Sequence, residues 1–221
     1  MRNPIGPGLV RGLFLWTLFA AASALAQNFT FEFMSGDAYN FPTPLTVHQA
    51  GYPDAQIMAD YQTEPFGPYT PYYTWRAALW DGQQAWELQQ VHHRLFLANP
   101  NDIIQSLAIH FGYNYFLLGH AWKIGEVILH VGAGVIICNP TDTVRGKLFQ
   151  AGGTGWFDEG YQLSGVGAQV AASHDFYFAG SAYVVLDVGL MGGLASVPVV
   201  DGSADVPNLS LHGHLGMGFG L

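Results

Sequence analysis

Residues 105–137 read QSLAIHFGYNYFLLGHAWKIGEVILHVGAGVII and contain two long runs in which apolar residues alternate with small or polar ones. A period of two is that of a β-strand, because successive side chains point to opposite faces; no amphipathic helix produces it. The first run, 105–121, predicts an outward face of Leu107, Ile109, Phe111, Tyr113, Tyr115 and Leu117 and an inward face of Ser106, Ala108, His110, Gly112, Asn114 and His120. The second run predicts outward Val127, Leu129, Val131, Ala133, Val135 and Ile137 and inward Glu126, His130, Gly132 and Gly134. With the short turn 122–125 between them, the two runs predict a β-hairpin.

The same alternation recurs on both sides of this hairpin. It is regular in 178–195 and 205–221 and less regular in 55–63, 71–81, 85–97 and 160–175. In 85–97 the apolar face changes, which a β-bulge near Gln89-Gln90 would reconcile. Eight strands are therefore predicted, and short alternating stretches at 28–34 and 44–50 leave ten as the alternative.

The composition indicates where such strands would lie. Only 10% of the residues are charged, 50% are hydrophobic and the mean hydropathy is +0.19, whereas soluble domains carry roughly 25% charged residues. After the N-terminus no apolar stretch approaches the roughly 20 residues of a membrane-spanning helix. In lipid the remaining structure that satisfies every backbone group is a closed barrel. We therefore expect an all-β, closed antiparallel transmembrane β-barrel.

The N-terminal segment predicts export. Residues 1–26 combine Arg2 and Arg11, an apolar run over 13–22 and the small-residue site Ala24-Leu25-Ala26, the layout of a secretory signal peptide. A retained anchor is the alternative, against which the shortness of the run argues. Residues 27–221 would then form one barrel domain.

Charge and cysteine content exclude several classes of function. The net charge of −9 argues against nucleic acid as a partner. The single Cys138 excludes a disulfide framework, and we interpret it as a small apolar residue. The soluble alternative, a β-sandwich or lipocalin-like barrel, would need more charge on its outer face.

The connections alternate in length. Those near 82–85, 122–125 and 174–178 are short, whereas 64–70, 98–104, 139–159 and 196–204 are longer and rich in Pro, Gly, Asn and Asp. This is the arrangement of short periplasmic turns and longer extracellular loops. Aromatic residues near the strand ends fit interfacial girdles.

The last eight residues, His214-Leu215-Gly216-Met217-Gly218-Phe219-Gly220-Leu221, fit the form polar-x-Gly-x-x-apolar-x-apolar. With the strand pattern, this resembles the small outer-membrane β-barrel proteins of Gram-negative bacteria, although their usual terminal residue is aromatic. The resemblance implies location in the cell outer membrane, recognition of the C-terminal strand by the barrel assembly machinery, and contact with outer-membrane lipid and lipopolysaccharide. It implies no activity, because such barrels include structural proteins, adhesins, channels and lipid-modifying enzymes.

The inward faces predict a polar lumen network. An eight-stranded barrel is only wide enough for side chains to fill it, so we expect ion pairs and hydrogen bonds that close the lumen. A structural or surface-binding role follows, with a narrow channel for small solutes as the alternative. The predicted lumen residues are Asp60, Arg76, Glu87, His92, Arg94, His110, Asn114, Glu126, His130, Asp187, His212 and His214, with Gln169 and Ser210 beside them.

Specific chemistry has weaker support in the sequence. A lipid-modifying acyl hydrolase or transferase is the third reading, with Ser210 and His212 two residues apart and Asp187 or Asp205 as orienting acid; the chain is expected not to be an enzyme. Known lipid A deacylase barrels have the order His-x-Ser, whereas this chain has Ser-x-His. The nine His show no metal-ligand spacing, so neither a metal nor a cofactor is expected. In the loop 139–159, Arg145 and Lys147 are candidates for binding lipopolysaccharide phosphates.

Overall fold

The computed structural model describes residues 28–64, 71–152 and 160–221. The predicted signal peptide, residues 1–26, lies outside these ranges. In the described residues every strand pairing is antiparallel, which confirms the predicted all-β antiparallel class. Within the same ranges, no helix is long and apolar enough to cross a membrane.

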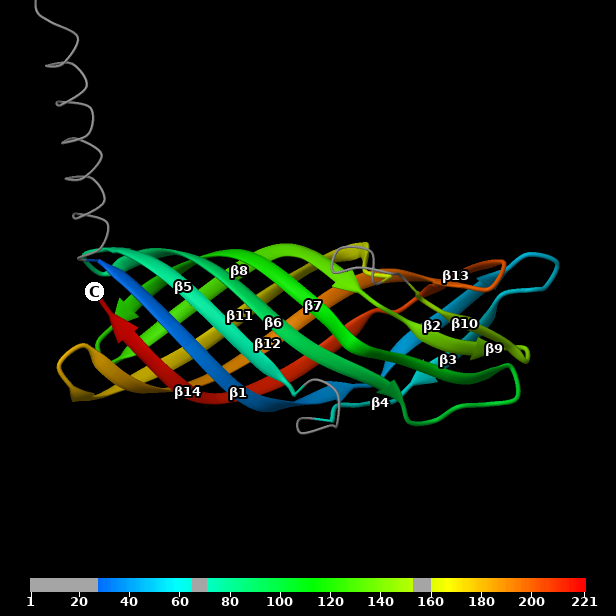
Figure 1. Ribbon diagram of the computed structural model, residues 1–221, viewed down its shortest axis with the longest axis horizontal. Helices are drawn as coiled ribbons and strands as arrows, with labels where there is room; N and C mark the ends of the chain where they lie inside the picture. Colours follow the sequence, from blue (N-terminus) through cyan, green and yellow to red (C-terminus); the bar gives the residue numbers. More distant parts are fainter. Residues whose placement is uncertain (1–27, 65–70, 153–159) are drawn as a thin grey trace, which may run out of the picture.

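Eight of the fourteen strands in the described ranges follow one another in a ring of pairings. They are β1 (Phe29–Phe41), β5 (Tyr73–Asp81), β6 (Gln84–Leu97), β7 (Ile104–Ile124), β8 (Val127–Cys138), β11 (Gln162–Ala179), β12 (Ala182–Val199) and β14 (Asn208–Gly220). Each pairs with the next in this order, and β14 pairs with β1. These eight strands are called the ring below, and Figure 1 shows them running diagonally side by side.

Six short strands gather at one end of the ring (Figure 1). They are β2 (Thr43–Gln49), β3 (Ala55–Ala59), β4 (Tyr61–Gln62), β9 (Thr141–Val144), β10 (Lys147–Gln150) and β13 (Gly202–Asp205). Strands β13, β2 and β3 continue the sheet from the end of β12, while β9 and β10 continue it from the start of β7. These strands, with the adjoining ends of β6, β7 and β12, are called the extension.

The opposite end of the ring holds the C-terminus and three tight turns, and is called the terminal end (Figure 1). The turns after β5, β7 and β11 each contain a glycine with positive φ, Gly82 at 60°, Gly125 at 65° and Gly180 at 57°. Glycine adopts this backbone conformation without the steric cost of a Cβ atom. Two predicted short turns, 82–85 and 122–125, match these positions. The third, at 174–178, is wrong, because these residues still pair with β12 and the turn follows at Gly180.

The strand assignment differs from the prediction at the N-terminal side. The segment 28–34, an optional ninth strand, belongs to the longer β1 of the ring. The segment 55–63 is not a ring strand, because β3 pairs with β2 and the short β4 pairs with the end of β6. Similarly, 196–204 is not a loop: its chain forms the end of β12 and the start of β13. Of the predicted long connections, 196–204 and the described part of 139–159 thus form hairpins of the extension, and 98–104 is a loop up to the start of β7. Residues 65–70 and 153–159 lie outside the described ranges.

The ring turns large apolar side chains outward and polar ones inward in the predicted phase on most strands. Leu186, Val188 and Leu190 of β12 are 46–50% exposed, whereas Asp187 between them is 1% exposed. On the neighbouring β14, the exposed side chains are Leu209, Leu211, Leu215, Met217 and Phe219, opposite buried Ser210, His212 and His214. The outer face of the ring is thus apolar along these two strands.

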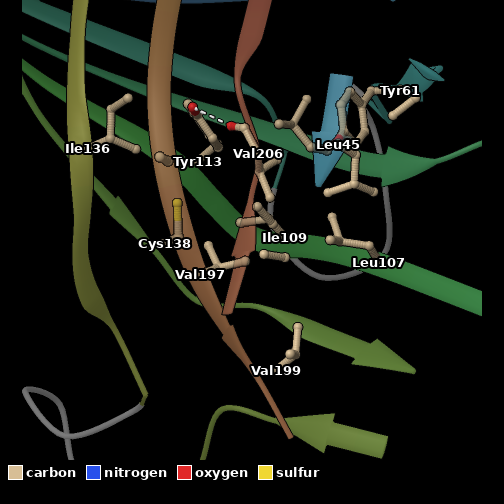
Figure 2. Close-up of a cluster of buried hydrophobic side chains, with 14 of the residues drawn as sticks. Leu45, Tyr61, Leu107, Ile109, Tyr113, Ile136, Cys138, Val197, Val199 and Val206 are labelled. Carbon is tan, nitrogen blue, oxygen red and sulfur yellow. Dashed lines mark hydrogen bonds between the residues drawn. The ribbon is translucent and has the colours of Figure 1, made fainter. Parts of the chain in front are cut away.

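The extension has the reverse polarity, because its inner side is an apolar core. Figure 2 shows Leu45, Leu107, Val197 and Val199, which come from β2, β7 and β12, gathered around one space. The Tyr113 hydroxyl donates to the Val206 carbonyl oxygen at 3.0 Å (Figure 2). Cys138 is buried in the same core, in keeping with a small apolar role.

This change of interior explains two wrong predictions of orientation. On β6 the pairing with β5 and β7 is uninterrupted through Gln89-Gln90, so no bulge occurs there, and buried Glu87, Gln89, Val91 and Leu95 share one face. The inward residues become apolar as the strand passes from the ring into the extension. On β7, of the six residues predicted outward, Leu107, Ile109, Tyr113, Tyr115 and Leu117 are buried and only Phe111 is exposed. Phe116 and Leu118 face outward instead, and the strand bulges at Gly112, where φ is 103°.

Candidate functional site

The polar interior of the ring is centred on Arg76 of β5, which is 1% exposed. Its guanidinium contacts Glu32 of β1 through Nη2 at 2.6 Å and Nε at 2.8 Å. Nη1 donates to Asp187 of β12 at 3.1 Å, and Nε lies 3.9 Å from Glu87 of β6. One cation therefore serves three buried carboxylates on three other strands. We call Glu32, Arg76, Glu87, Asp187, His130 and His214 the charged cluster.

Two histidines complete the charged cluster by binding carboxylates. His130 Nδ1 lies 2.9 Å from Glu87 Oε2, and His214 Nδ1 lies 2.7 Å from Asp187 Oδ1. Buried carboxylates need such partners, since an unpaired buried charge is costly. A carboxylate that contacts Nδ1 fixes the imidazole so that this nitrogen donates its hydrogen.

Beyond His130 the hydrogen bonds end at a serine. His130 Nε2 lies 2.9 Å from Ser173 Oγ of β11. Glu87, His130 and Ser173 are each no more than 3% exposed. The three side chains thus form a linear acid, imidazole and hydroxyl arrangement across β6, β8 and β11.

A second chain of hydrogen bonds leads from Asp187 through His214 towards the extension. The Tyr72 hydroxyl lies between His214 Nε2, at 2.6 Å, and His212 Nδ1. His212 Nε2 lies 2.7 Å from Ser210 Oγ. The predicted catalytic candidates Ser210 and His212 are therefore in contact, but Asp187 reaches them only through His214 and Tyr72.

The hydrogen bonds at Asn40 and Asn208 determine which groups donate in this second chain of hydrogen bonds. Asn40 Nδ2 donates to the Tyr61 carbonyl oxygen, which leaves Asn40 Oδ1 to accept from Asn208 Nδ2. Asn208 Oδ1 then accepts the hydrogen of the Ser210 hydroxyl at 2.9 Å. Because a hydroxyl has one hydrogen, Ser210 accepts from His212 Nε2 and does not donate to it. The Ser210–His212 contact is therefore not that of a nucleophile and its base.

Tyrosine rings lie against glycines of other strands and fill the space beside these networks. A Cβ at Gly218 would be 2.3 Å from the Tyr183 ring, and one at Gly167 would be 2.6 Å from the Tyr115 ring. Tyr183 also donates to Glu32 at 3.0 Å. Gly218 and Gly167 thus make room for tyrosine rings.

The structure brings together only part of the predicted lumen set. Arg76, Glu87, His130, Asp187, His212 and His214 are buried in the interior, with Ser210 and Gln169, the latter hydrogen-bonded to Gln89. Asp60 and Glu126 are exposed, because they lie in the link between β3 and β4 and in the turn after β7. Their assignment to the lumen is therefore wrong.

Four other predicted lumen residues lie on the outer face of β6 and β7. His92 stacks on Tyr73 with ring centroids 5.0 Å apart, and Tyr73 stacks on the exposed Phe33. Asn114 accepts from His92 at 2.7 Å on the same face. Arg94 and His110 belong to the same group, since Arg94 Nε donates to the His110 carbonyl oxygen at 3.2 Å. Their placement differs from the prediction because β6 has no bulge at Gln89-Gln90 and because β7 turns Tyr113 and Tyr115 inward.

The two loop cations are engaged within the chain. Arg145 donates to Gln49 Oε1 at 2.9 Å and to the Pro53 carbonyl oxygen at 2.8 Å. Lys147 Nζ lies 2.8 Å from Asp201 Oδ2. Both hold turns of the extension together. The alternative acid Asp205 pairs with His48 in the extension, far from Ser210 in the hydrogen-bond network.

Several residues of the site were missed from the sequence. Glu32 could have been found, because Phe31 and Phe33 alternate with it in a segment left as an optional strand. Ser173 and Tyr72 carry no local signal, since neither lies in a motif. In the described parts of the chain, no group of three or more His, Cys, Asp or Glu side chains is arranged to hold a metal ion.

Comparisons with known proteins find similar solved structures at low sequence identity. No protein-family model matches the chain, and no curated protein matches it significantly. Among solved structures it is similar to Ail, the attachment invasion locus protein of Yersinia pestis, with 12% identity, a TM-score of 0.40 and 85% of this chain and 97% of that chain covered. It is similar to outer membrane protein AlkL, determined in lipid bilayers, with 14% identity, a TM-score of 0.45 and coverage of 87% and 89%. OprG from Pseudomonas aeruginosa gives 11% identity, a TM-score of 0.44 and coverage of 89% and 96%. AlkL and OprG are outer membrane proteins, and at these identities and TM-scores the similarity carries no argument about this chain.

Proposed function

We propose that the protein is an outer-membrane β-barrel in which the ring is a closed barrel of eight transmembrane strands. The observation that carries this is the apolar outer face opposite the charged cluster. On β14 the exposed apolar row runs from Leu209 to Phe219, ten steps of about 3.3 Å each. At a strand tilt of about 40° this row spans about 25 Å, the height of the apolar band in such barrels.

The orientation follows from the two ends of the ring. Outer-membrane barrels place short turns in the periplasm and longer connections outside the cell. The terminal end, with its tight turns, then faces the periplasm and the extension projects from the cell. The first 26 residues serve as the export signal, and the C-terminal strand β14 as the contact with the barrel assembly machinery. Lipopolysaccharide and phospholipid cover the outer face.

The role proposed for the barrel is structural or surface binding rather than transport. Supporting this, Arg76 and its carboxylates span the interior of the ring, and the rings of Tyr183 and Tyr115 lie against glycines of other strands. An eight-stranded barrel leaves little space once such side chains are in place. At the other end, the extension closes over its own apolar core. Binding would then occur on the exposed surface of the extension, since loops and hairpins on a rigid barrel commonly carry function.

The test has two parts. The mature protein refolded in detergent should migrate differently on gels before and after boiling, as a closed barrel does, and should give a β-type circular dichroism spectrum. In planar bilayers it should give no stepwise conductance. Stable single-channel steps would support the alternative, a narrow channel for small solutes, and folding in buffer without detergent would contradict the membrane assignment.

A further inference from the structure

Ser173 differs from the other buried serine of the ring in its hydrogen bonding. Among the described residues, the hydrogen-bond partner of its hydroxyl is His130 Nε2, at 2.9 Å. If His130 donates from Nδ1 to Glu87, its Nε2 is free to accept, and the Ser173 hydrogen then has a partner. This accounting favours a neutral His130 imidazole with the Ser173 hydroxyl as donor. It is the arrangement of a serine nucleophile with its general base and orienting acid. Ser210, in contrast, donates to Asn208.

A pocket lies next to this arrangement. At the terminal end, Lys123, Ile128 and Asp175 help to line a cavity of about 310 Å³. Ile128 is the register partner of Ser173 on the adjacent strand, and Asp175 follows Ser173 by two residues on the same inward face. Ser173 therefore lies one layer of side chains behind this cavity, which we call the mouth pocket. Ile128, 5% exposed, both lines the pocket and flanks Ser173.

We propose that Ser173, activated by His130 and oriented through Glu87, is a nucleophile that accepts the acyl group of a small ester entering through the mouth pocket. This goes beyond the structural role proposed above and does not depend on where the barrel is located. Ser173 Oγ forms a bond to the acyl carbon and its proton passes to His130 Nε2. The bond between the acyl carbon and the alcohol oxygen breaks, and the departing alcohol takes the proton. Water then releases the carboxylic acid by the same steps.

The first experiment maps a covalent adduct on the folded protein. The protein in detergent micelles is treated with diisopropyl fluorophosphate, which loses fluoride when a serine attacks its phosphorus, and then digested for mass spectrometry. The expected result is an adduct on Ser173 and none on Ser210. Unheated gels establish that the protein is folded during labelling. Because the wild-type chain is used, this result does not depend on whether a variant folds.

Variants then test the roles. Ile128→Ala, which opens the layer between the mouth pocket and Ser173, should raise the labelling rate several-fold. His130→Gln should lower it by roughly 10²–10⁴-fold, the usual contribution of a general base. Ser210→Ala is the matched control, since this serine also touches a histidine, and should label as the wild type does. The rates of p-nitrophenyl acetate hydrolysis by the wild type and these variants should follow the same order as their labelling rates.

Either of two results would overturn the proposal. One is the absence of an adduct on Ser173 in both the folded wild-type protein and folded Ile128→Ala. The other is labelling of Ser173 at an unchanged rate in folded His130→Gln, which would make the contact purely structural. Neither result would alter the assignment of the ring as a membrane barrel.

Discussion

Replacing Arg76 by Met tests whether the charged cluster holds the ring together. The side chain keeps a similar length but loses the only guanidinium within reach of Glu32 and Asp187 among the described residues. At contact distances near 3 Å and an effective dielectric constant of about 20, each such pair is attracted by about 5–6 kcal/mol. Most of this offsets the cost of burying the charges. In the variant that cost remains for the carboxylates while the attraction is gone.

We therefore expect Arg76→Met to lower the free energy of unfolding by about 3–5 kcal/mol. The measurement is urea unfolding in phospholipid vesicles, followed by the folded band on unheated gels. Thr74→Val is the matched control, because Thr74 is also buried and inward on β5 but takes part in two uncharged hydrogen bonds, donating to the Gln90 carbonyl oxygen and accepting from Gln89 Nε2. Its expected cost is about 1 kcal/mol. If Arg76→Met cost no more than the control, the charged cluster would not be a main source of stability.

Three further predictions concern other parts of the chain. Gly218→Ala should lower the free energy of unfolding by about 1–3 kcal/mol in the same assay, because the added Cβ would displace Tyr183. The control Gly213→Ala, on the same strand, meets nothing within 4 Å and should lower it far less. Equal losses in the two variants would contradict the packing of Tyr183 against Gly218. Burial raises the pKa of Asp142, in the extension, to about 7, so the folded extension favours the protonated carboxyl. The stability of the extension should therefore fall as pH rises from about 4 to 7, by at most about 1.4 kcal/mol per pH unit. Asp142→Asn should remove this dependence in hydrogen exchange of β9, and a persisting dependence would assign it to another group. Arg145→Met should speed amide exchange in the turn between β2 and β3, and unchanged exchange would show that its contacts there are dispensable.

Strands with one polar and one apolar face could be predicted from the sequence. On β14 each inward residue is Asn, Ser, His or Gly and each outward residue except Gly213 is Leu, Met or Phe, so the phase has one solution. On β12 the outward Leu186, Val188 and Leu190 alternate with the inward Asp187 and Gly189 in the same way. On β7 both faces are apolar, since Phe116 and Leu118 face outward while Tyr115 and Leu117 fill the interior. The two-residue period of the sequence predicted that strand. Which face of it points inward depends on the change from the polar interior of the ring to the apolar core of the extension.

The candidate site was predictable to the same degree. Arg76, Glu87 and Asp187 were found because an isolated charge in an alternating apolar strand has to face inward. The link of Glu87 through His130 to Ser173 joins three strands that are far apart in sequence. No spacing rule within one segment reveals it, because the contact depends on the register of the ring.

The most direct test of the membrane barrel compares two neighbouring positions on β14. Leu211 is 45% exposed on the outer face, and Ser210 is fully buried in the interior. Cysteines are introduced singly at these positions in protein reconstituted into vesicles, with the buried Cys138 left in place, and treated with a maleimide soluble in the lipid phase. The account predicts rapid labelling of Leu211→Cys and none of Ser210→Cys. Equal labelling of both, or labelling of Ser210→Cys alone, would contradict it.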